Sequence, residues 1–354
     1  MLSMPDDCIL QVTDLTKHFP IEAGFFRRKQ IGAVRAVDGV SFSVPTGKTL
    51  GLVGESGCGK TTTARAILRA LDPTSGSVLF RTRQGVVDMA TLKGPALKGA
   101  RSDMQMIFQD PYSSLNPRLP IMDIIAEPMK AHGYPRQDRE ERVKELLELV
   151  GLRAEYARRY PHSFSGGQRQ RIGVARALAL RPALIVADEP VSALDVSVQA
   201  QVLNLLLDLQ ERLGLSFVFI GHDLSVVRYL CDTVAVMYLG KIVELAPVDA
   251  LYEEPRHPYT STLLSAVPDA DPHAPWRRDI VKGEVTGDER EMVGCSFEPR
   301  CGYAREICRK QTPELLVAGK DDSHFAACHF AVTNGVRPQN EIGGLTPENK
   351  EKIQ

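Results

Sequence analysis

The sequence predicts an α/β fold in which helices cover both faces of a mostly parallel β-sheet. Three segments carry this prediction: the unbroken apolar runs at residues 184–187 and 217–220, and a glycine-rich turn at residues 54–61. Unbroken apolar runs of this length are typical of strands that are buried on both faces. The chain has 354 residues, and this length favours one large domain with a smaller appendage. Its net charge is −1.

The first elements are expected to be strands at residues 10–15 and 40–44, where apolar and polar residues alternate. The segment between them, residues 21–35, is a basic loop with Phe25 and Phe26 near its tip. Two interpretations of this loop stay open. It is a solvated hairpin connection, or it contacts a partner protein or lipid headgroups.

Residues 54–61 read G-E-S-G-C-G-K-T, between an apolar strand at 49–53 and a helix that continues from Thr62. Glycines let backbone amides turn toward phosphate oxygens, and the helix start adds positive potential. Lys60 would contact the outer phosphates, and the Thr61 hydroxyl would ligate Mg²⁺. The loop therefore predicts a nucleoside triphosphate site. The residues expected to contact the nucleotide here are Gly54, Glu55, Ser56, Gly57, Cys58, Gly59, Lys60, Thr61 and Thr62.

Two amphipathic helices are predicted further along, at residues 138–149 and in the segment after Asp195. Asp138 and Glu141 have the spacing of a capping box at the start of the first helix. Gly214 is expected to end the second helix.

The buried strand at residues 184–187 is followed directly by two acids, Asp188 and Glu189. A carboxylate at such a strand end can hold Mg²⁺, directly or through water, and we expect Asp188 to do so. Glu189 is then placed to orient or deprotonate the water that attacks the γ-phosphate.

A second anion cradle is expected where Ser165, Gly166, Gly167 and Gln168 begin a helix, because a capping hydroxyl and free amides meet a positive helix end there. One chain does not need two cradles for one nucleotide. We therefore expect these residues to cover the nucleotide that a second subunit holds. An ordinary capped helix is the alternative.

These motifs, with Gln109, Asp195 and His222, stand in the order seen in ABC-transporter ATPases, and the chain resembles that family. The resemblance implies a P-loop NTPase domain of the ABC-ATPase type, with a RecA-like core, an antiparallel β subdomain and an α-helical signature subdomain at about residues 110–180. It implies that Gln109 senses Mg²⁺ and the γ-phosphate, that Asp195 couples the two sites of a dimer, and that His222 contacts the γ-phosphate. Glu189, His222 and Lys60 are then the catalytic residues. Phe19 resembles the aromatic residue that stacks on adenine, with core packing as its alternative.

The resemblance narrows to the F-type ATPase subunit of dipeptide and oligopeptide importers, through residues 108–118 and 257–268. It implies an ATPase domain at 8–265, an extension at 266–335 and a disordered tail at 336–354. It also implies a related ATPase subunit as partner, as a heterodimer, two membrane permeases, and indirectly an extracytoplasmic solute-binding protein. A homodimer would use the same motifs. No nucleic acid is expected, because the basic residues form no net positive domain.

A permease helix is expected to dock on residues 109–129, which are rich in apolar side chains; a core-facing helix is the alternative. The apolar residues of this segment are Tyr112, Leu115, Leu119, Ile121, Met122, Ile124, Ile125 and Met129.

Two other functions stay open. Importers of nickel, glutathione or opines would use the same ATPase motifs. Soluble ABC ATPases of DNA repair or translation carry a long coiled-coil insertion or tandem ATPase domains, and neither is seen in this sequence.

Four of the seven cysteines, Cys295, Cys301, Cys308 and Cys328, lie close together near the C-terminus. No apolar run reaches the ~20 residues of a membrane-spanning helix, and residues 1–10 lack a signal-peptide pattern. We therefore expect the chain to stay in the cytoplasm, where thiols stay reduced. The resemblance to importer subunits implies that it works at the cytoplasmic face of the membrane. Clustered thiols in such a chain indicate a metal, and their spacing is looser than in zinc knuckles. We expect a [4Fe–4S] cluster that orders the extension, with zinc or free thiols as alternatives.

Overall fold

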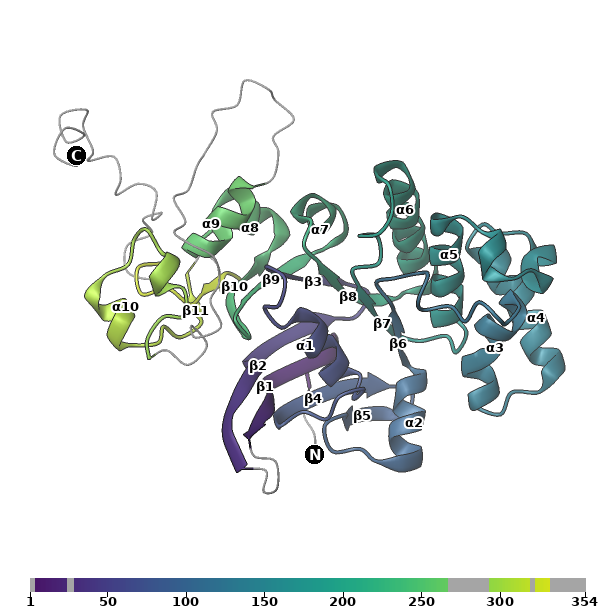
Figure 1. Cartoon of the computed structure of the whole chain (residues 1–354), viewed down its shortest axis with the longest axis horizontal. Helices are drawn as coiled ribbons and strands as arrows, with labels where there is room; N and C mark the ends of the chain where they lie inside the picture. The colour runs from purple at the N-terminus through teal and green to yellow at the C-terminus, as the bar shows by residue number, and fades with distance from the viewer. Residues whose placement is uncertain (1–3, 24–28, 267–292, 319–321, 332–354) are drawn as a thin grey trace. The chain divides into compact units, whose positions relative to one another are not determined.

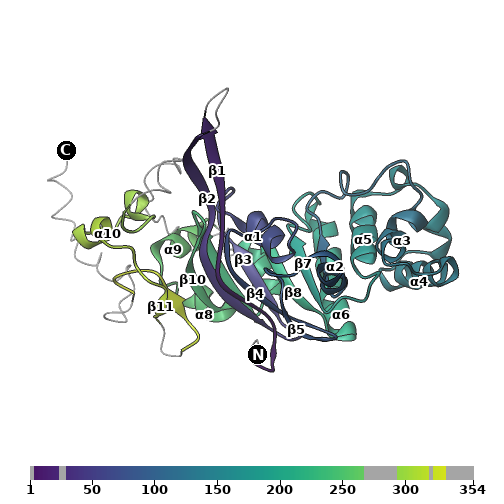
Figure 2. The ribbon, with the colours of Figure 1, turned by 90° about the horizontal axis from the view of Figure 1, so that it is seen from below.

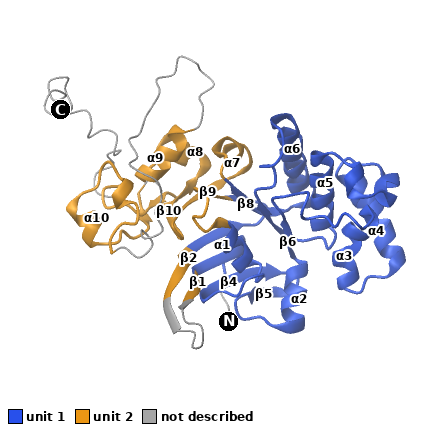
Figure 3. Ribbon diagram, viewed as in Figure 1, with its two compact units in different colours: residues 1–15, 41–50, 61–221 blue, residues 16–40, 51–60, 222–354 orange. Residues whose placement is uncertain are grey.

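The computed structural model describes residues 4–23, 29–266, 293–318 and 322–331. Contacts divide the chain into two compact units (Figure 3). Unit 1 comprises residues 1–15, 41–50 and 61–221, and unit 2 comprises residues 16–40, 51–60 and 222–354. Three strands run along the chain from one unit into the other: β1 (Cys8–Ala23), β2 (Lys29–Pro45) and β3 (Thr49–Val53). The tip of the basic loop, with Phe25 and Phe26, and the predicted tail at 336–354 lie outside the described residues.

Unit 1 contains a parallel ladder that confirms the sheet predicted from the apolar runs. In it, β7 pairs with β6 on one side and β8 on the other, with Leu184 opposite both Met104 and Ser216. Every residue of β7 and β8 is buried, as expected of strands covered on both faces. The strands of unit 1 are β4 (Ser75–Thr82), β5 (Gly85–Asp88), β6 (Met104–Ile107), β7 (Leu184–Asp188) and β8 (Ser216–Gly221).

The helices α3, α4 and α5 of unit 1 pack on one another, as two views of the ribbon show (Figure 1 and Figure 2). Most apolar side chains of α3, among them Ile124, Ile125 and Met129, are buried, whereas Met122 is partly exposed. The first helix, α1 (Lys60–Ile67), begins at Lys60, the last residue of the 51–60 segment of unit 2, and continues in unit 1. The other helical elements of unit 1 are α2 (Gly94–Ser102), α3 (Ile121–Ala131), α4 (Arg136–Leu149), η1 (Ala154–Arg158), η2 (Pro161–Ser163), α5 (Gly166–Ala177) and α6 (Val196–Leu213). Within the described ranges of the whole chain, no helix is both long and apolar enough to cross a membrane.

The two predicted helix starts have different outcomes. The helix α4 begins at Arg136 after Pro135 and has no side-chain cap, so the capping box predicted at Asp138 is wrong. The fixed φ of proline already favours a helix start at that point, and Asp138 falls inside the first turn. The helix α6 follows Asp195 as predicted, and Gly214 ends it in a left-handed conformation with φ of 64°.

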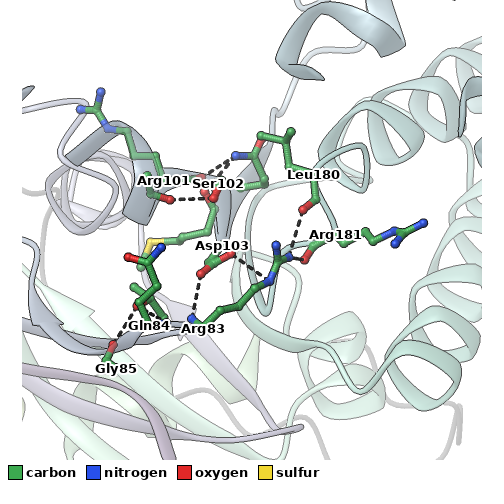
Figure 4. Close-up of polar contacts among 12 residues, drawn as sticks. Arg83, Gln84, Gly85, Arg101, Ser102, Asp103, Leu180 and Arg181 are labelled. Atoms are coloured by element: carbon green, nitrogen blue, oxygen red, sulfur yellow. Dashed lines mark hydrogen bonds and ion pairs between the residues drawn. The ribbon is translucent and has the colours of Figure 1, made fainter. Parts of the chain in front are cut away.

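An ion pair between Arg83 and Asp103 anchors the β4–β5 hairpin of unit 1 (Figure 4). Arg83 donates to the buried Asp103 carboxylate from its backbone N–H at 3.0 Å, and its Nη2 donates to the Leu180 carbonyl at 3.1 Å. The Asp103 carbonyl in turn accepts from Ala183 N–H at 2.8 Å. These bonds join the hairpin to the start of β6 and to the turn before β7.

Unit 2 contains an antiparallel sheet in the order β9, β10, β12, β11. The register of β10 against β9 shifts between Ile242 and Glu244, which is a β-bulge. On its other edge, β10 pairs Glu244 with Ala326 of β12, so the C-terminal segment adds strands to this sheet. The elements are α7 (Leu224–Leu230), β9 (Thr233–Tyr238), β10 (Lys241–Pro247), α8 (Val248–Glu253), α9 (Pro258–Ser265), η4 (Glu298–Arg300), α10 (Glu306–Lys310), β11 (Leu316–Val317) and β12 (Phe325–Ala326).

Candidate functional site

The glycine-rich loop follows β3 and needs glycine at three positions. Gly54, Gly57 and Gly59 have φ values of 149°, 78° and 114°, which side-chain-bearing residues rarely adopt. A Cβ on Gly54 would lie 2.2 Å from the Met237 carbonyl oxygen, and one on Gly59 would lie 2.2 Å from the Ala36 carbonyl oxygen. The loop therefore packs closely on neighbouring backbone, and only glycine fits at these positions.

Lys60 is the last residue before the closing threonine of the loop, and its ammonium contacts backbone carbonyls of the same loop. The side chain is buried, and Nζ donates to the Gly54 carbonyl at 2.7 Å and the Glu55 carbonyl at 3.0 Å. Phosphate oxygens would be stronger acceptors for the same ammonium. Cys58 lies beneath it, and burial raises the pKa of the Cys58 thiol, so this residue acts as a small neutral filler.

The acids predicted at the strand end lie together with two polar partners in unit 1. The carboxyl ends of the parallel strands β6 and β7 meet at one edge of the sheet, which brings Gln109 to Glu189. Gln109 Nε2 donates to Glu189 Oε2 at 2.9 Å, and Thr61 Oγ1 donates to Asp188 Oδ1 at 3.1 Å.

Thr61 and Asp188 fit a magnesium ion. Hydroxyl and carboxylate oxygens are the donors that Mg²⁺ prefers. Thr61 Oγ1 and Asp188 Oδ1 lie 3.1 Å apart, so both oxygens would be within reach of one ion. Gln109, the third predicted ligand, is turned with its amide nitrogen toward Glu189 in this structure.

Glu189 has a strained backbone, with φ of 45°. A non-glycine residue in this region costs about 1–3 kcal/mol and persists only where its surroundings hold it. Here its N–H donates to the Ile220 carbonyl at 2.9 Å, and its own carbonyl accepts from Ser192 N–H at 3.2 Å. These two hydrogen bonds hold the residue in this conformation, and strain of this kind clusters at functional sites.

The predicted second cradle combines a capped helix start with a tight packing contact. Ser165 accepts from Gln168 N–H at 3.4 Å, and the Gln168 side chain accepts from Ser165 N–H at 3.1 Å, which forms a capping box. A Cβ on Gly167 would lie 2.3 Å from Val198 of α6. This glycine therefore has a packing reason as well as the predicted anion-binding one, whereas a Cβ on Gly166 would meet only ordinary contacts.

Three further predicted residues are placed as follows. Asp195 caps α6, and hydrogen bonds from the Ser197 hydroxyl and Val198 N–H lower the pKa of its carboxyl. His222 is exposed in unit 2, directly after β8. The Phe19 ring is 37% exposed with the Lys17 ammonium 5.0 Å from its centre, so core packing does not account for this aromatic residue.

The predicted [4Fe–4S] cluster is wrong. Among the residues that the structure describes, which include all four cysteines, no group of three or more His, Cys, Asp and Glu side chains could hold a metal ion. The same finding gives no support to the alternative that the four cysteines bind zinc. All four are free thiols. Burial raises the pKa of Cys295 to about 12 and that of Cys301 to about 11, so these two thiols are protonated near neutral pH. Closeness of cysteines along the chain is therefore not enough to form a metal site.

Other residues order the extension. Phe297 is buried against Tyr238 and Tyr259, with ring centroids 5.3 and 5.5 Å away. His324 Nε2 lies 2.7 Å from the carboxylate of Glu244, which is fully buried. The sequence did not predict these contacts, although residues 257–268, which include Tyr259, carried the resemblance to importer subunits.

The buried His257 predicts a loss of stability in acid. Its Nδ1 accepts from Tyr259 N–H at 3.1 Å, and burial lowers the pKa of the imidazole to about 4. Between the ordinary value near 6.5 and about 4, the unfolded chain takes up a proton that the folded chain excludes. Stability from this residue is therefore complete above pH 6.5 and falls by up to about 3 kcal/mol toward pH 4.

His257→Asn keeps a capping acceptor but removes the titration, so its urea midpoint should fall less between pH 7 and pH 4.5 than that of the wild type. His162→Asn, which changes an exposed histidine, serves as control and should behave like the wild type. Equal pH dependence in the wild type and His257→Asn would contradict this explanation.

Two family models match the chain. Residues 37–192 match the model described as ABC transporter, and residues 243–308 match the model described as oligopeptide/dipeptide transporter, C-terminal region.

Named relatives match nearly the whole chain. The oligopeptide transport ATP-binding protein AppF of Bacillus subtilis (strain 168) is 51% identical over 334 residues, covering 93% of this chain and 99% of that protein. The di/tripeptide transport ATP-binding protein DppF of Pseudomonas aeruginosa (strain UCBPP-PA14) is 47% identical over 334 residues, covering 92% and 98%. The probable peptide ABC transporter ATP-binding protein y4tS of Sinorhizobium fredii is 52% identical over 324 residues, covering 91% and 90%.

Solved structures share the fold. The dimeric ATP-binding cassette MJ0796, in a post-hydrolysis state bound to ADP and Pi, is 26% identical with a TM-score of 0.58, covering 68% of this chain and 99% of that chain. The cassette cbiO1 from Clostridium perfringens, part of the transporter complex cbiONQ, has a TM-score of 0.58 at 24% identity, covering 70% and 92%.

Proposed function

Since the chain belongs to the family of ATP-binding subunits of ABC-type oligopeptide and dipeptide transporters, we propose that it hydrolyses ATP to energise the import of short peptides. The observation that carries this proposal is the match to a peptide-transport subunit at 51% identity, over 93% of this chain and 99% of that protein. The C-terminal match at residues 243–308 favours peptides over nickel, glutathione or opines as cargo.

The phosphate loop and its neighbours divide the chemistry among them. Loop amides and Lys60 hold the phosphates, while Thr61 and Asp188 hold magnesium, which offsets phosphate charge when bound. Glu189 orients and deprotonates the attacking water. Gln109 donates a hydrogen bond to the Glu189 carboxylate. Gln109 gives up this bond when it senses Mg²⁺ and the γ-phosphate. His222 contacts the γ-phosphate, and Phe19 stacks on adenine.

Two subunits complete each other's sites in this proposal. Residues 165–168 and Asp195 act on the nucleotide held by a related ATPase subunit, in a heterodimer. Binding of two ATP molecules closes the pair and drives two membrane permeases to rearrange, and hydrolysis resets them. The subunit works at the cytoplasmic face of the membrane, and an extracytoplasmic solute-binding protein supplies the peptide. The helical subdomain at about 110–180 and the extension at 266–335 remain predicted boundaries.

Docking on a permease depends on the apolar residues of the 109–129 segment that stay exposed. Leu115, Ile121 and Met129 are buried, so they belong to the core, whereas Tyr112 is 58% exposed and Leu119 is 36% exposed. A permease helix would contact Tyr112 and Leu119, because burying exposed apolar surface stabilises such contacts.

Leu119→Asp should lower peptide transport by about 5–100-fold while the subunit still folds and hydrolyses ATP, because a charge in the docking contact costs about 1–3 kcal/mol. The measurement is ATP hydrolysis and peptide uptake by the same reconstituted complex. Leu213→Asp, which changes an exposed leucine at the end of α6, is the control. Fully coupled transport in Leu119→Asp would rule out this docking surface.

The assembly itself is tested by purifying the tagged chain from native membranes and identifying bound proteins by mass spectrometry. We expect a second ABC ATPase and two permease subunits in equal amounts. Recovery of the chain with DNA-repair or translation proteins instead would contradict the proposed function.

A further inference from the structure

A residue of the C-terminal extension forms an ion pair with the second residue of the phosphate loop. Arg300 Nη1 and Nη2 donate to the two carboxylate oxygens of Glu55, each at 2.9 Å. The two residues are 245 positions apart in the chain. Two parallel N–H···O bonds of this length are the strong, directional form of an arginine–carboxylate pair.

The arginine is held firmly in this position. Its side chain is 8% exposed, and its guanidinium lies 5.7 Å from the centre of the Tyr238 ring and 5.8 Å from that of Phe297. The hydrogen bonds to Glu55 raise the pKa of Arg300, so its charge is permanent. Both rings are buried, which fixes the side chain of Arg300 in one place.

A second contact reaches the same loop residue through its backbone. Glu55 N–H donates to the hydroxyl of Tyr259 at 2.8 Å, and Tyr259 is fully buried. Glu55 is therefore fixed by its side chain and by its amide, and both partners lie outside the ATPase motifs.

We propose that Arg300 and Tyr259 are positioning residues for the phosphate loop, and that Arg300 neutralises Glu55 so that the loop accepts a triphosphate; this rests on the ATPase function proposed above. An unpaired carboxylate on the loop would repel the phosphates, because like charges at short range oppose each other. The extension thereby sets the affinity of the loop for ATP.

The test is equilibrium binding of a non-hydrolysable ATP analogue with Mg²⁺ to the full chain, with variants at both ends of the pair. Arg300→Met, which leaves Glu55 unpaired, should weaken binding by about 10–100-fold, the usual cost of removing one partner of such a pair. In the double variant Glu55→Gln with Arg300→Met the repelling charge is gone, and most of the affinity should return.

The matched control is Arg309→Met, which removes an exposed arginine of the same extension from its pair with Glu298 and should bind like the wild type. Arg300→Lys keeps the charge but loses the second bond, so it should fold and bind with intermediate affinity. Tyr259→Phe keeps the packing and removes the acceptor for Glu55 N–H, which should weaken binding a few-fold, by about 1 kcal/mol.

The outcomes separate the two proposals. A wild-type chain that binds no nucleotide contradicts the ATPase function. The positioning role is overturned if the wild type binds the ATP analogue and both Arg300→Met and Arg300→Lys bind it as tightly as the wild type does. The role is also overturned if adding Glu55→Gln to Arg300→Met restores no affinity for the ATP analogue. Arg300 would then contribute packing but not charge neutralisation.

Discussion

Glu189→Gln is expected to slow ATP hydrolysis by about 10²–10⁴-fold, the usual contribution of a positioned general base, while ATP still binds. The amide keeps the shape of the side chain and can still accept from Gln109, but it cannot take a proton from water. Glu189 follows the buried Asp188 directly and is held by a backbone with φ of 45°. Steady-state turnover of the assembled complex, with ATP binding measured separately, tests this expectation.

Glu145→Gln is the matched control, because Glu145 is an exposed carboxylate that pairs with Arg142 on α4. It should turn over ATP like the wild type. Near-normal turnover in Glu189→Gln would mean that another group activates the water.

Lys60→Met should weaken ATP binding by about 100-fold or more, because two charged hydrogen bonds to phosphate contribute about 1.5–3 kcal/mol each. The substitution keeps the apolar length of the side chain, which is buried. It removes the ammonium that donates to the carbonyls of Gly54 and Glu55 in this structure. Titration with a fluorescent ATP analogue measures the change.

Lys310→Met is the control for loss of a positive charge in the same unit, since Lys310 is exposed and pairs with Glu306 one helical turn away. Its ATP affinity should be unchanged. If Lys60→Met bound ATP as tightly as the wild type, the phosphate loop would not be the site of binding.

The strand-end acids could be predicted because local patterns determine them. The buried strand before Asp188 is an unbroken apolar run, and parallel strands place their carboxyl ends at one edge. The contact between Gln109 and Glu189 follows from that geometry. Ser165 could be predicted as a helix cap for the same reason, since capping depends on residues three positions apart.

The remaining features depend on residues that are distant in sequence. The packing of Gly167 on Val198 and the pair between Arg300 and Glu55 are set by tertiary structure, which no local spacing reveals. The cysteine prediction was wrong for the same reason. Sequence spacing counts thiols within a segment, but metal binding requires their sulfur atoms to converge.

The measurement that tests the central claim most directly is ATP-driven uptake of a labelled dipeptide or oligopeptide. The complex purified through this chain is reconstituted in proteoliposomes, with the nucleotide supplied on the side of the ATPase subunit and the binding protein on the other. We expect uptake that requires Mg²⁺ and ATP and that Glu189→Gln abolishes. Peptide uptake that continues without ATP, or ATP-driven uptake of nickel or glutathione with no uptake of peptide, would contradict the account.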